Sequence, residues 1–119
     1  MSNYVDVYVL PVPKAKIGAY LEIARLAGTV WREHGALDYV EVIGDDVTPG
    51  VHTSFPQAVK LEAGETVVVG WITFKSREDR DRVNALAMRD PRLANTDPKT
   101  MPFDGRRMFW GGFETLVTV

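Results

Sequence analysis

The sequence of 119 residues contains no cysteine and only two histidines. The absence of cysteine excludes disulfides, thiolate metal ligands and a cysteine nucleophile together. Two isolated histidines and scattered carboxylates do not supply a metal ligand set, so we expect no metal site and no cofactor. A Gly-x-Ser-x-Gly elbow and a glycine-rich phosphate loop are also missing. The sequence therefore contains no recognisable reaction motif.

A large excess of charge and a long apolar run are missing as well. The 14 basic and 16 acidic residues give a net charge of −2, which does not attract phosphate backbones or an anionic membrane. No segment has the roughly 18 consecutive apolar residues that span a bilayer. The N-terminus also lacks the basic flank and apolar stretch of a signal peptide. We expect a cytoplasmic protein without nucleic-acid or membrane partners.

What is present is the composition of a packed globular protein. Hydrophobic residues make up 45% of the chain and charged residues 25%, as in ordinary soluble domains. A chain of this length forms one domain around one core. We therefore expect residues 1–119 to fold as a single domain.

Two segments have the apolar content of β-strands. In segment 4–12, alternate residues form one aliphatic face, whereas the other face carries Tyr4, Asp6 and Tyr8. Segment 66–74 carries no charge at all, which predicts a central strand buried on both faces. Either of its two alternating sets of side chains could face the uncovered side of a sheet. Weaker patterns predict two further strands at 37–43 and 106–119.

Helical spacing of apolar residues predicts a helix from Ile17 to about His34, which Gly35 ends. Ser76 and Asp79 form an N-cap pattern for a second helix. In the last strand, Gly111 and Gly112 predict a bulge or a close approach by another backbone.

The predicted order is strand, helix, strand, strand, helix, strand. This is the ferredoxin-like βαββαβ arrangement of the α+β class, a four-stranded antiparallel sheet with both helices on one face. The opposite face is too apolar for water, so a second subunit should bury it. We expect a homodimer with two sheets packed face to face, and an interface that includes Tyr4, Asp6 and Tyr8.

Several aromatic and polar side chains are candidates for a pocket. Aromatic walls with a few polar groups are the usual lining of small-molecule sites, although most strand aromatics belong to the core or an interface. Asn84 could serve such a site or lie on a solvated helix flank. Arg107 could bind a carboxylate or phosphate, or pair with Asp104 or with the partner subunit. The candidate pocket residues are Trp31, His34, Trp71, Asn84, Arg107 and Trp110.

His34 is the only histidine expected on a regular element. It could transfer protons near neutral pH, because the ordinary pKa of histidine is about 6.5. The favoured alternative is that its ring satisfies free carbonyls at the end of the helix. The long connection before residue 66 also has two interpretations. Its segment 54–60, an N-capped short helix, could act as a lid or partner-binding segment, or could cover one end of the sheet.

The sequence resembles the DUF1428 family of small bacterial proteins over nearly the whole chain, and five segments carry the resemblance. They are YVDVYVLPVP, VWREHGALDYVEVIGDD, TSFPQAVKL, DPRL and MPFDGRRMFWGGFE. The resemblance implies a dimeric α/β barrel, in which ferredoxin-like subunits pair through their sheets. The function of that family is unassigned and supplies no catalytic residues. Neighbouring families include cofactor-free monooxygenases and other small-molecule enzymes.

These observations favour a homodimeric small-molecule-binding protein or a cofactor-independent enzyme, with the enzyme resting on analogy alone. The alternative is a structural or protein-interaction dimer without a ligand. A solvent-reachable cavity lined by Trp31, His34 and Trp71 would favour the first, and a filled core the second. RNA binding is disfavoured because segment 66–74 has no charged residue. The sequence does not specify a ligand, a reaction or a pathway.

Overall fold

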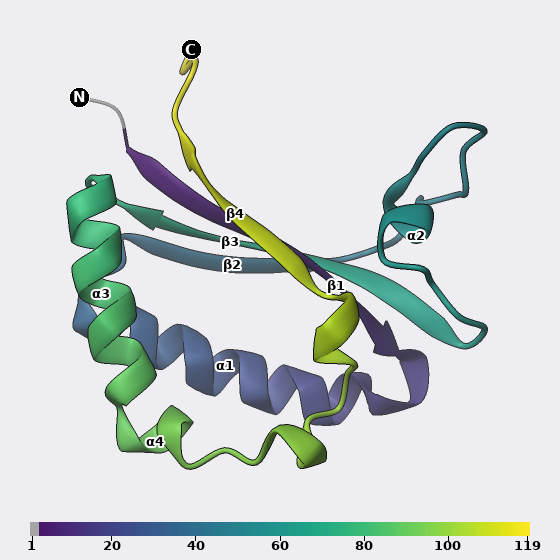
Figure 1. The fold of residues 1–119 in the computed structure, drawn as a ribbon, viewed down its shortest axis with the longest axis horizontal. Coiled ribbons are helices and arrows are strands. Elements are labelled where there is room, and N and C mark those ends of the chain that lie inside the picture. Colours follow the sequence, from purple (N-terminus) through teal and green to yellow (C-terminus); the bar gives the residue numbers. More distant parts are fainter. Residues whose placement is uncertain (1–2) are drawn as a thin grey trace.

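The strands and long helices follow the predicted order in this computed structural model, which describes residues 3–119 (Figure 1). Short helices occupy the connections between them. The strands are β1 (Tyr4–Pro13), β2 (Asp38–Ile43), β3 (Glu65–Phe74) and β4 (Phe109–Glu114). The α-helices are α1 (Ile17–His34), α2 (Phe55–Ala58), α3 (Arg77–Arg89) and α4 (Pro91–Ala94). Single 3-10 turns are η1 (Lys14–Lys16), η2 (Pro98–Thr100) and η3 (Gly105–Arg107).

All strand pairs are antiparallel, and the sheet order is β2-β3-β1-β4. This order confirms the ferredoxin-like α+β fold, with β3 in a central position as predicted. Helices α1 and α3 cover the same side of the sheet, whereas α2 lies on the opposite side (Figure 1). The molecule is accordingly a thin slab, with extents of 39 × 38 × 20 Å.

The local signals for helix ends are confirmed. Gly35 follows α1 with a φ of 122°, a conformation that favours glycine. The hydroxyl of Ser76 accepts a hydrogen bond from the Asp79 backbone N–H at 3.1 Å, and so caps α3. Ser54 caps the short helix α2 in the same way, through the Gln57 backbone N–H at 3.2 Å.

The prediction that Tyr4, Asp6 and Tyr8 face away from the helices is wrong. Asp6 accepts a hydrogen bond from Arg80 of α3 at 2.8 Å, and Tyr8 packs against the core beneath α1. The reason is that the Asp6 carboxylate finds partners in Arg80 and Asn84 inside the subunit, so a face that carries a carboxylate and tyrosine rings can be buried. Polarity alone therefore assigned the two faces of β1 the wrong way round.

The face opposite α1 and α3 is almost entirely apolar. Val7 pairs with Trp71, which in turn pairs with Val40, so their side chains lie on one surface across three strands. At one end of this surface Val59, from the segment around α2, packs on Val9 and Val67 and buries them. The remainder, called here the open sheet face, consists of the apolar Val5, Val7, Val40, Val42, Val69, Trp71, Phe109 and Phe113, with Gly111 among them and Thr73 and Asp38 at its edge.

The last strand is shorter than predicted. It begins at Phe109, because Gly105–Arg107 form a 3-10 turn capped by the Asp104 side chain, and it ends at Glu114. Its pairing with β1 runs without interruption, so no bulge is present. Gly112 does accommodate a close approach, but by the Tyr4 ring, whose hydroxyl would lie 2.4 Å from an added Cβ. Gly111 has only ordinary contacts, and the prediction is wrong there.

No helix among residues 3–119 is long and apolar enough to cross a bilayer. The cytoplasmic location stays a prediction.

Candidate functional site

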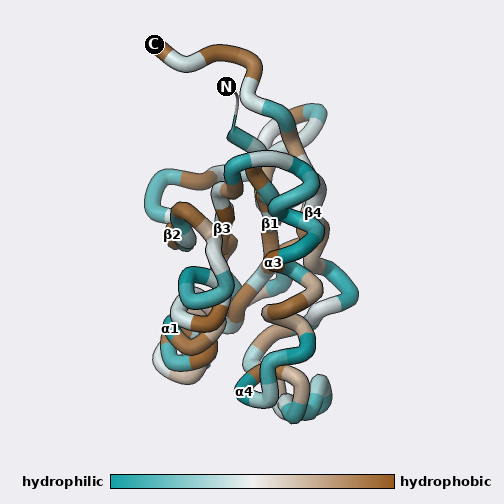
Figure 2. The backbone as a smooth tube through the Cα atoms, turned by 90° about the vertical axis from the view of Figure 1, so that its left-hand side faces the viewer, coloured by the Kyte–Doolittle hydropathy of each residue, from teal (hydrophilic) through white to brown (hydrophobic). Residues whose placement is uncertain are grey.

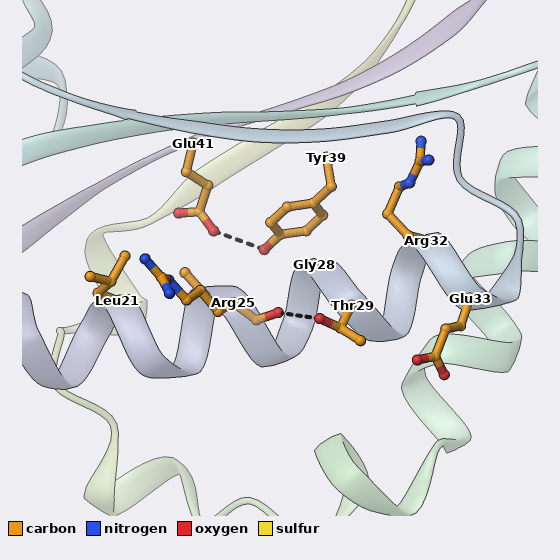
Figure 3. A pocket seen from close by; sticks show the side chains of 9 residues that line it. Leu21, Arg25, Gly28, Thr29, Arg32, Glu33, Tyr39 and Glu41 are labelled. Atoms are coloured by element: carbon orange, nitrogen blue, oxygen red, sulfur yellow. Dashed lines mark hydrogen bonds between the residues drawn. The ribbon is translucent and has the colours of Figure 1, made fainter.

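A groove of about 630 Å³ runs between helix α1 and the edge strand β2. Figure 3 shows Tyr39 and Glu41 of β2 projecting toward α1, whose side chains form the opposite wall. The lining is Leu21, Ala24, Arg25, Gly28, Thr29, Arg32, Glu33, Tyr39 and Glu41. The groove thus combines an apolar wall with charged groups of both signs, a composition suited to a small polar molecule.

The groove follows from the register of β2 and from one glycine on α1. Tyr39 and Glu41 lie opposite Ile72 and Gly70 of β3 and share the helix-covered face. Opposite them, Gly28 allows the Tyr39 ring to approach the helix, because an added Cβ would lie 2.8 Å from its Cδ1 atom. Since β2 is an edge strand, the space beside Glu41 opens to solvent rather than to another strand.

Two tyrosines hold the Glu41 carboxylate in a fixed position. The Tyr39 hydroxyl donates a hydrogen bond to Glu41 Oε2 at 2.8 Å, and the Tyr20 hydroxyl donates one to Oε1. Tyr20 is a buried residue of α1, so this bond joins the helix to the edge strand. A carboxylate that accepts two phenol hydrogen bonds retains lone pairs for a ligand donor. Glu41 is therefore a rigid acceptor at the floor of the groove.

Tyr8 extends this cluster across the sheet. Its ring lies over Gly70, where an added Cβ would be 2.2 Å from Tyr8 Cζ. The Tyr8 hydroxyl is buried beside Tyr39 and makes no hydrogen bond of ordinary geometry within residues 3–119. A buried hydroxyl without a partner carries a free-energy cost. The cluster is thus a polar interior that reaches from the groove to the middle of the sheet.

The pKa values of the three tyrosines all lie above the ordinary value of 10. Burial is the main cause for Tyr8, Tyr20 and Tyr39, and the neighbouring Glu41 carboxylate raises each pKa further. The phenols consequently stay protonated at physiological pH. Those of Tyr20 and Tyr39 act as hydrogen-bond donors to Glu41 rather than as bases.

Two guanidinium groups line the groove and form no hydrogen bond or ion pair with another side chain in the described part of the chain. Arg25 and Arg32 are seven residues apart on α1, which separates their Cα atoms by about 10 Å along the helix axis. Guanidinium groups bind carboxylates and phosphates. The arrangement can therefore hold an anionic group near the arginines and a hydrogen-bond donor at Glu41.

Sequence reasoning missed this groove. It singled out histidine, tryptophan and paired arginines, whereas the groove depends on Glu41, Tyr20, Tyr39 and Gly28. The alternation of Tyr39 and Glu41 was visible in the sequence. Whether these two side chains line a groove depends on which face of β2 meets α1, and on how close Gly28 lets the two elements approach.

Of the predicted pocket residues, Trp31 and Asn84 are brought together. The Trp31 indole N–H donates to Asn84 Oδ1 at 2.9 Å, and Asn84 Nδ2 donates to Asp6 Oδ2 at 3.2 Å. Asn84 is therefore an internal bridge between α1, α3 and β1, and not part of a solvated flank. Its hydrogen-bonding groups are used within the subunit, so this cluster has a structural role.

Arg80 completes this cluster as a buried cation. Its guanidinium pairs with Asp6 Oδ1 at 2.8 Å and lies 5.0 Å from the Tyr4 ring centroid. The ring centroid of the predicted pocket residue Trp110 lies 5.9 Å from the same guanidinium. Burial raises the pKa of Asp6, although the hydrogen bond from Asn84 and the charge of Arg80 act in the opposite direction. Both residues of this pair are buried.

His34 was predicted either to serve a pocket or to satisfy free carbonyls at the end of α1, and the structure places it in neither position. Its Nε2 atom lies 2.9 Å from Asp90 Oδ2, so the ring pairs with a carboxylate and not with helix-end carbonyls. Asp90 also accepts hydrogen bonds from Arg92. The hydrogen bonds with Arg92 and with His34 both lower the pKa of Asp90. The His34–Asp90 pair joins the end of α1 to the start of α4.

The remaining two candidates lie elsewhere. Trp71 belongs to the open sheet face, on the opposite side from His34. Arg107 forms a bidentate pair with Glu65, at 2.7 Å for both contacts, and also contacts Asp104 at 3.1 Å. The pairing of Arg107 with Asp104 is thus confirmed. A second pocket of about 410 Å³ is lined by these charges at the start of β3. Neither pocket is lined by Trp31, His34 or Trp71.

Comparisons with known proteins agree on the family and the fold. A family described as "Protein of unknown function (DUF1428)" matches residues 3–105. The "Uncharacterized protein YbaA" of Escherichia coli K12 is 46% identical over 115 residues, which cover 97% of each chain. The protein of the same name from Shigella flexneri matches equally well. Among solved structures, a NIPSNAP family protein with unknown function from Agrobacterium tumefaciens has a TM-score of 0.53 at 16% identity. That match covers 95% of this chain and 86% of the other, and shows a common fold.

Proposed function

The chain belongs to the DUF1428 family, and we propose that it is a homodimeric small-molecule-binding protein whose ligand occupies the groove between α1 and β2. The observation that carries this proposal is the Glu41 carboxylate, held by two tyrosines at the floor of that groove. The polar atoms of the Trp31–Asn84–Asp6 cluster are used internally, whereas Glu41 still has acceptor capacity.

The groove favours a ligand with a hydrogen-bond donor and an anionic group. An amine or hydroxyl group of the ligand would donate to Glu41, and a carboxylate or phosphate would lie near Arg25 or Arg32. Leu21, Ala24 and the ring of Tyr39 supply apolar contacts for the rest of the molecule. No catalytic step is assigned, because the three phenols of the cluster are held protonated.

Two observations support the homodimer. The chain has an accessible surface of 8073 Å², whereas a compact monomer of its mass of 13.3 kDa has about 6,500 Å². This excess is larger than the roughly 800 Å² that each partner buries in a standard interface. Much of the open sheet face is apolar and solvent-reachable, including Phe109 and Phe113. A second copy packed on it would also leave no open sheet for RNA bases.

A dimer without a ligand is the second candidate function. It is favoured by the linings of the two pockets, which include none of Trp31, His34 and Trp71, and by the internal hydrogen bond of Trp31. On this alternative the groove would be only a surface depression beside an edge strand.

A thermal-shift screen against metabolites tests the proposed site. A ligand that binds the native protein raises its melting temperature by mass action. Substitution of Glu41 by Gln removes the charge but preserves the size of the side chain. We expect a metabolite that stabilises the wild type to lose most of its effect on the Glu41→Gln variant.

Glu22→Gln is the matched control, because Glu22 lies exposed on α1 and does not line the groove. It should retain the full thermal shift. An equal shift in the Glu41→Gln variant would place the ligand elsewhere and contradict the proposed site. If no metabolite in a broad screen stabilises the wild type, the ligand-free dimer is the better description.

A further inference from the structure

The segment that follows β4 is the most exposed apolar part of the described chain. Leu116 is 96% exposed and Val117 is 73% exposed, and Val119 is also fully exposed. The segment starts from a fixed point, since Thr115 binds the backbone carbonyl of Asn3 through its N–H at 3.2 Å and through its hydroxyl at 2.7 Å. Its base is therefore held on β1, while its apolar side chains have no cover within the subunit.

This segment projects on the same side of the sheet as the open sheet face. Figure 1 shows the C-terminal end of the chain and α2 on the side away from α1 and α3, at opposite ends of the sheet. Figure 2 confirms that the segment rises away from the helices and includes strongly hydrophobic residues. The open sheet face thus lies between two raised ends, one built by the α2 segment and one by residues 115–119.

The dimensions match those of a second sheet layer. Four extended residues span at most about 13 Å, whereas two sheets packed face to face lie about 10 Å apart. Residues 116–119 are therefore long enough to pass through the layer that a second sheet would occupy. A contact with the second copy would cover Leu116 and Val117.

Steric exclusion indicates which end of the second copy this contact involves. The α2 segment already occupies the space above Val9 and Val67, so the partner's sheet cannot lie there. If two copies met with their α2 segments at the same end, those segments would compete for the same layer. With the copies in the opposite orientation, residues 115–119 of one copy meet the α2 segment of the other. There Phe55 is half exposed.

We propose that residues 115–119 of each chain pack against the α2 segment of a second copy, so that Leu116 and Val117 contact Phe55 of the partner subunit. The inference rests on the homodimer proposed above. It assigns an interface role to residues 115–119 and to the α2 segment, neither of which belongs to the open sheet face. It also gives the long connection between β2 and β3 a function in assembly.

Sedimentation equilibrium of the full chain tests this contact. The variant carrying Leu116→Asp and Val117→Asp should dimerise at least about tenfold more weakly than the wild type, because burying two unpaired carboxylates in the contact carries a large desolvation cost. Met88→Asp is the matched control, since Met88 is 64% exposed on α3, on the helix-covered side. It should leave the dimer dissociation constant within about twofold.

The absence of native cysteine allows a second, direct test. A single Val117→Cys variant labelled with benzophenone maleimide should cross-link to residues 44–64 of the other chain, and Met88→Cys should not. If the wild type is a monomer, the homodimer itself fails. If the wild type is a dimer that the double substitution does not weaken, or if the cross-links map outside 44–64, only this inference is overturned.

Discussion

The two faces of the sheet differ in the side chains that they carry and in what covers them. The face beneath α1 and α3 contains tyrosines and charged groups, and the buried Asp6 and Arg80 on this side pair with each other inside the subunit. The open sheet face contains almost only apolar side chains and has no helix over it. The comparison shows that polar residues can mark the inside of a subunit, whereas the mostly apolar open sheet face is the surface on which we propose that a second subunit binds.

The largest expected effect comes from the buried charge pair on the helix-covered face. Asp6→Ala leaves the Arg80 guanidinium buried without its carboxylate, which should reduce the free energy of unfolding by about 3–5 kcal/mol. Urea denaturation at a fixed protein concentration measures the change. Asp81→Ala is the control, because Asp81 pairs with the same arginine but is largely exposed. It should cost less than about 1 kcal/mol. Equal effects of the two substitutions would mean that burial of the pair is unimportant.

A smaller effect is expected where a glycine makes room for a tyrosine on the same face. Gly70→Ala places a Cβ within 2.2 Å of the Tyr8 ring, so the ring must move and the cluster around Glu41 must rearrange. We expect a loss of about 1–3 kcal/mol in the free energy of unfolding. Gly18→Ala is the matched change in open space near the start of α1. It should be neutral or stabilising by up to about 1 kcal/mol. A stable Gly70→Ala variant would contradict the close packing of Tyr8.

The smallest effect concerns pH, and it contrasts the buried Asp6 with the carboxylates around Arg107. Arg107 lowers the pKa of Glu65, and Arg106 with Arg107 lowers that of Asp104 to about 2. Because these folded-state values lie below the unfolded ones, their stabilisation is complete above the unfolded pKa and is lost as the pH falls toward about 2. The pKa of Asp6 is raised instead, so acidification does not destabilise the fold through Asp6.

The measurement is the urea midpoint at pH 5 and at pH 3. Arg107→Gln should reduce the difference between the two midpoints, since Glu65 and Asp104 then titrate closer to their ordinary pKa values. Arg89→Gln, on the exposed side of α3, serves as the charge-matched control. An unchanged difference in the Arg107→Gln variant would show that this cluster is not a source of acid sensitivity.

Much of the fold could be predicted from local patterns. The caps at Ser54 and Ser76, the stop at Gly35 and the uncharged central strand each depend on neighbours in the sequence, and each is confirmed. The start of β4 could not be placed, because the turn at Gly105–Arg107 is fixed by Asp104 and by the pairing of Arg107 with the distant Glu65.

The site could be predicted far less well, for a physical reason. Its geometry depends on contacts between distant residues, such as Gly28 with Tyr39 and Tyr20 with Glu41. Neither glycine nor tyrosine signals function by itself. The residues that did attract notice have structural partners instead, as Asn84 has in Asp6 and His34 has in Asp90.

The most direct test of the account is the mass of the wild-type protein in solution. The helices cover one face of the sheet within the subunit, and the open sheet face is proposed to be covered by a second copy. Sedimentation velocity at about 10 μM, a concentration at which standard-size interfaces are normally occupied, should give twice the chain mass of 13.3 kDa. Val7→Asp, which places a charge at the centre of the open sheet face, should shift the mass toward that of one chain while the far-ultraviolet circular dichroism is unchanged. A wild-type protein that sediments as a single chain of 13.3 kDa would contradict the account.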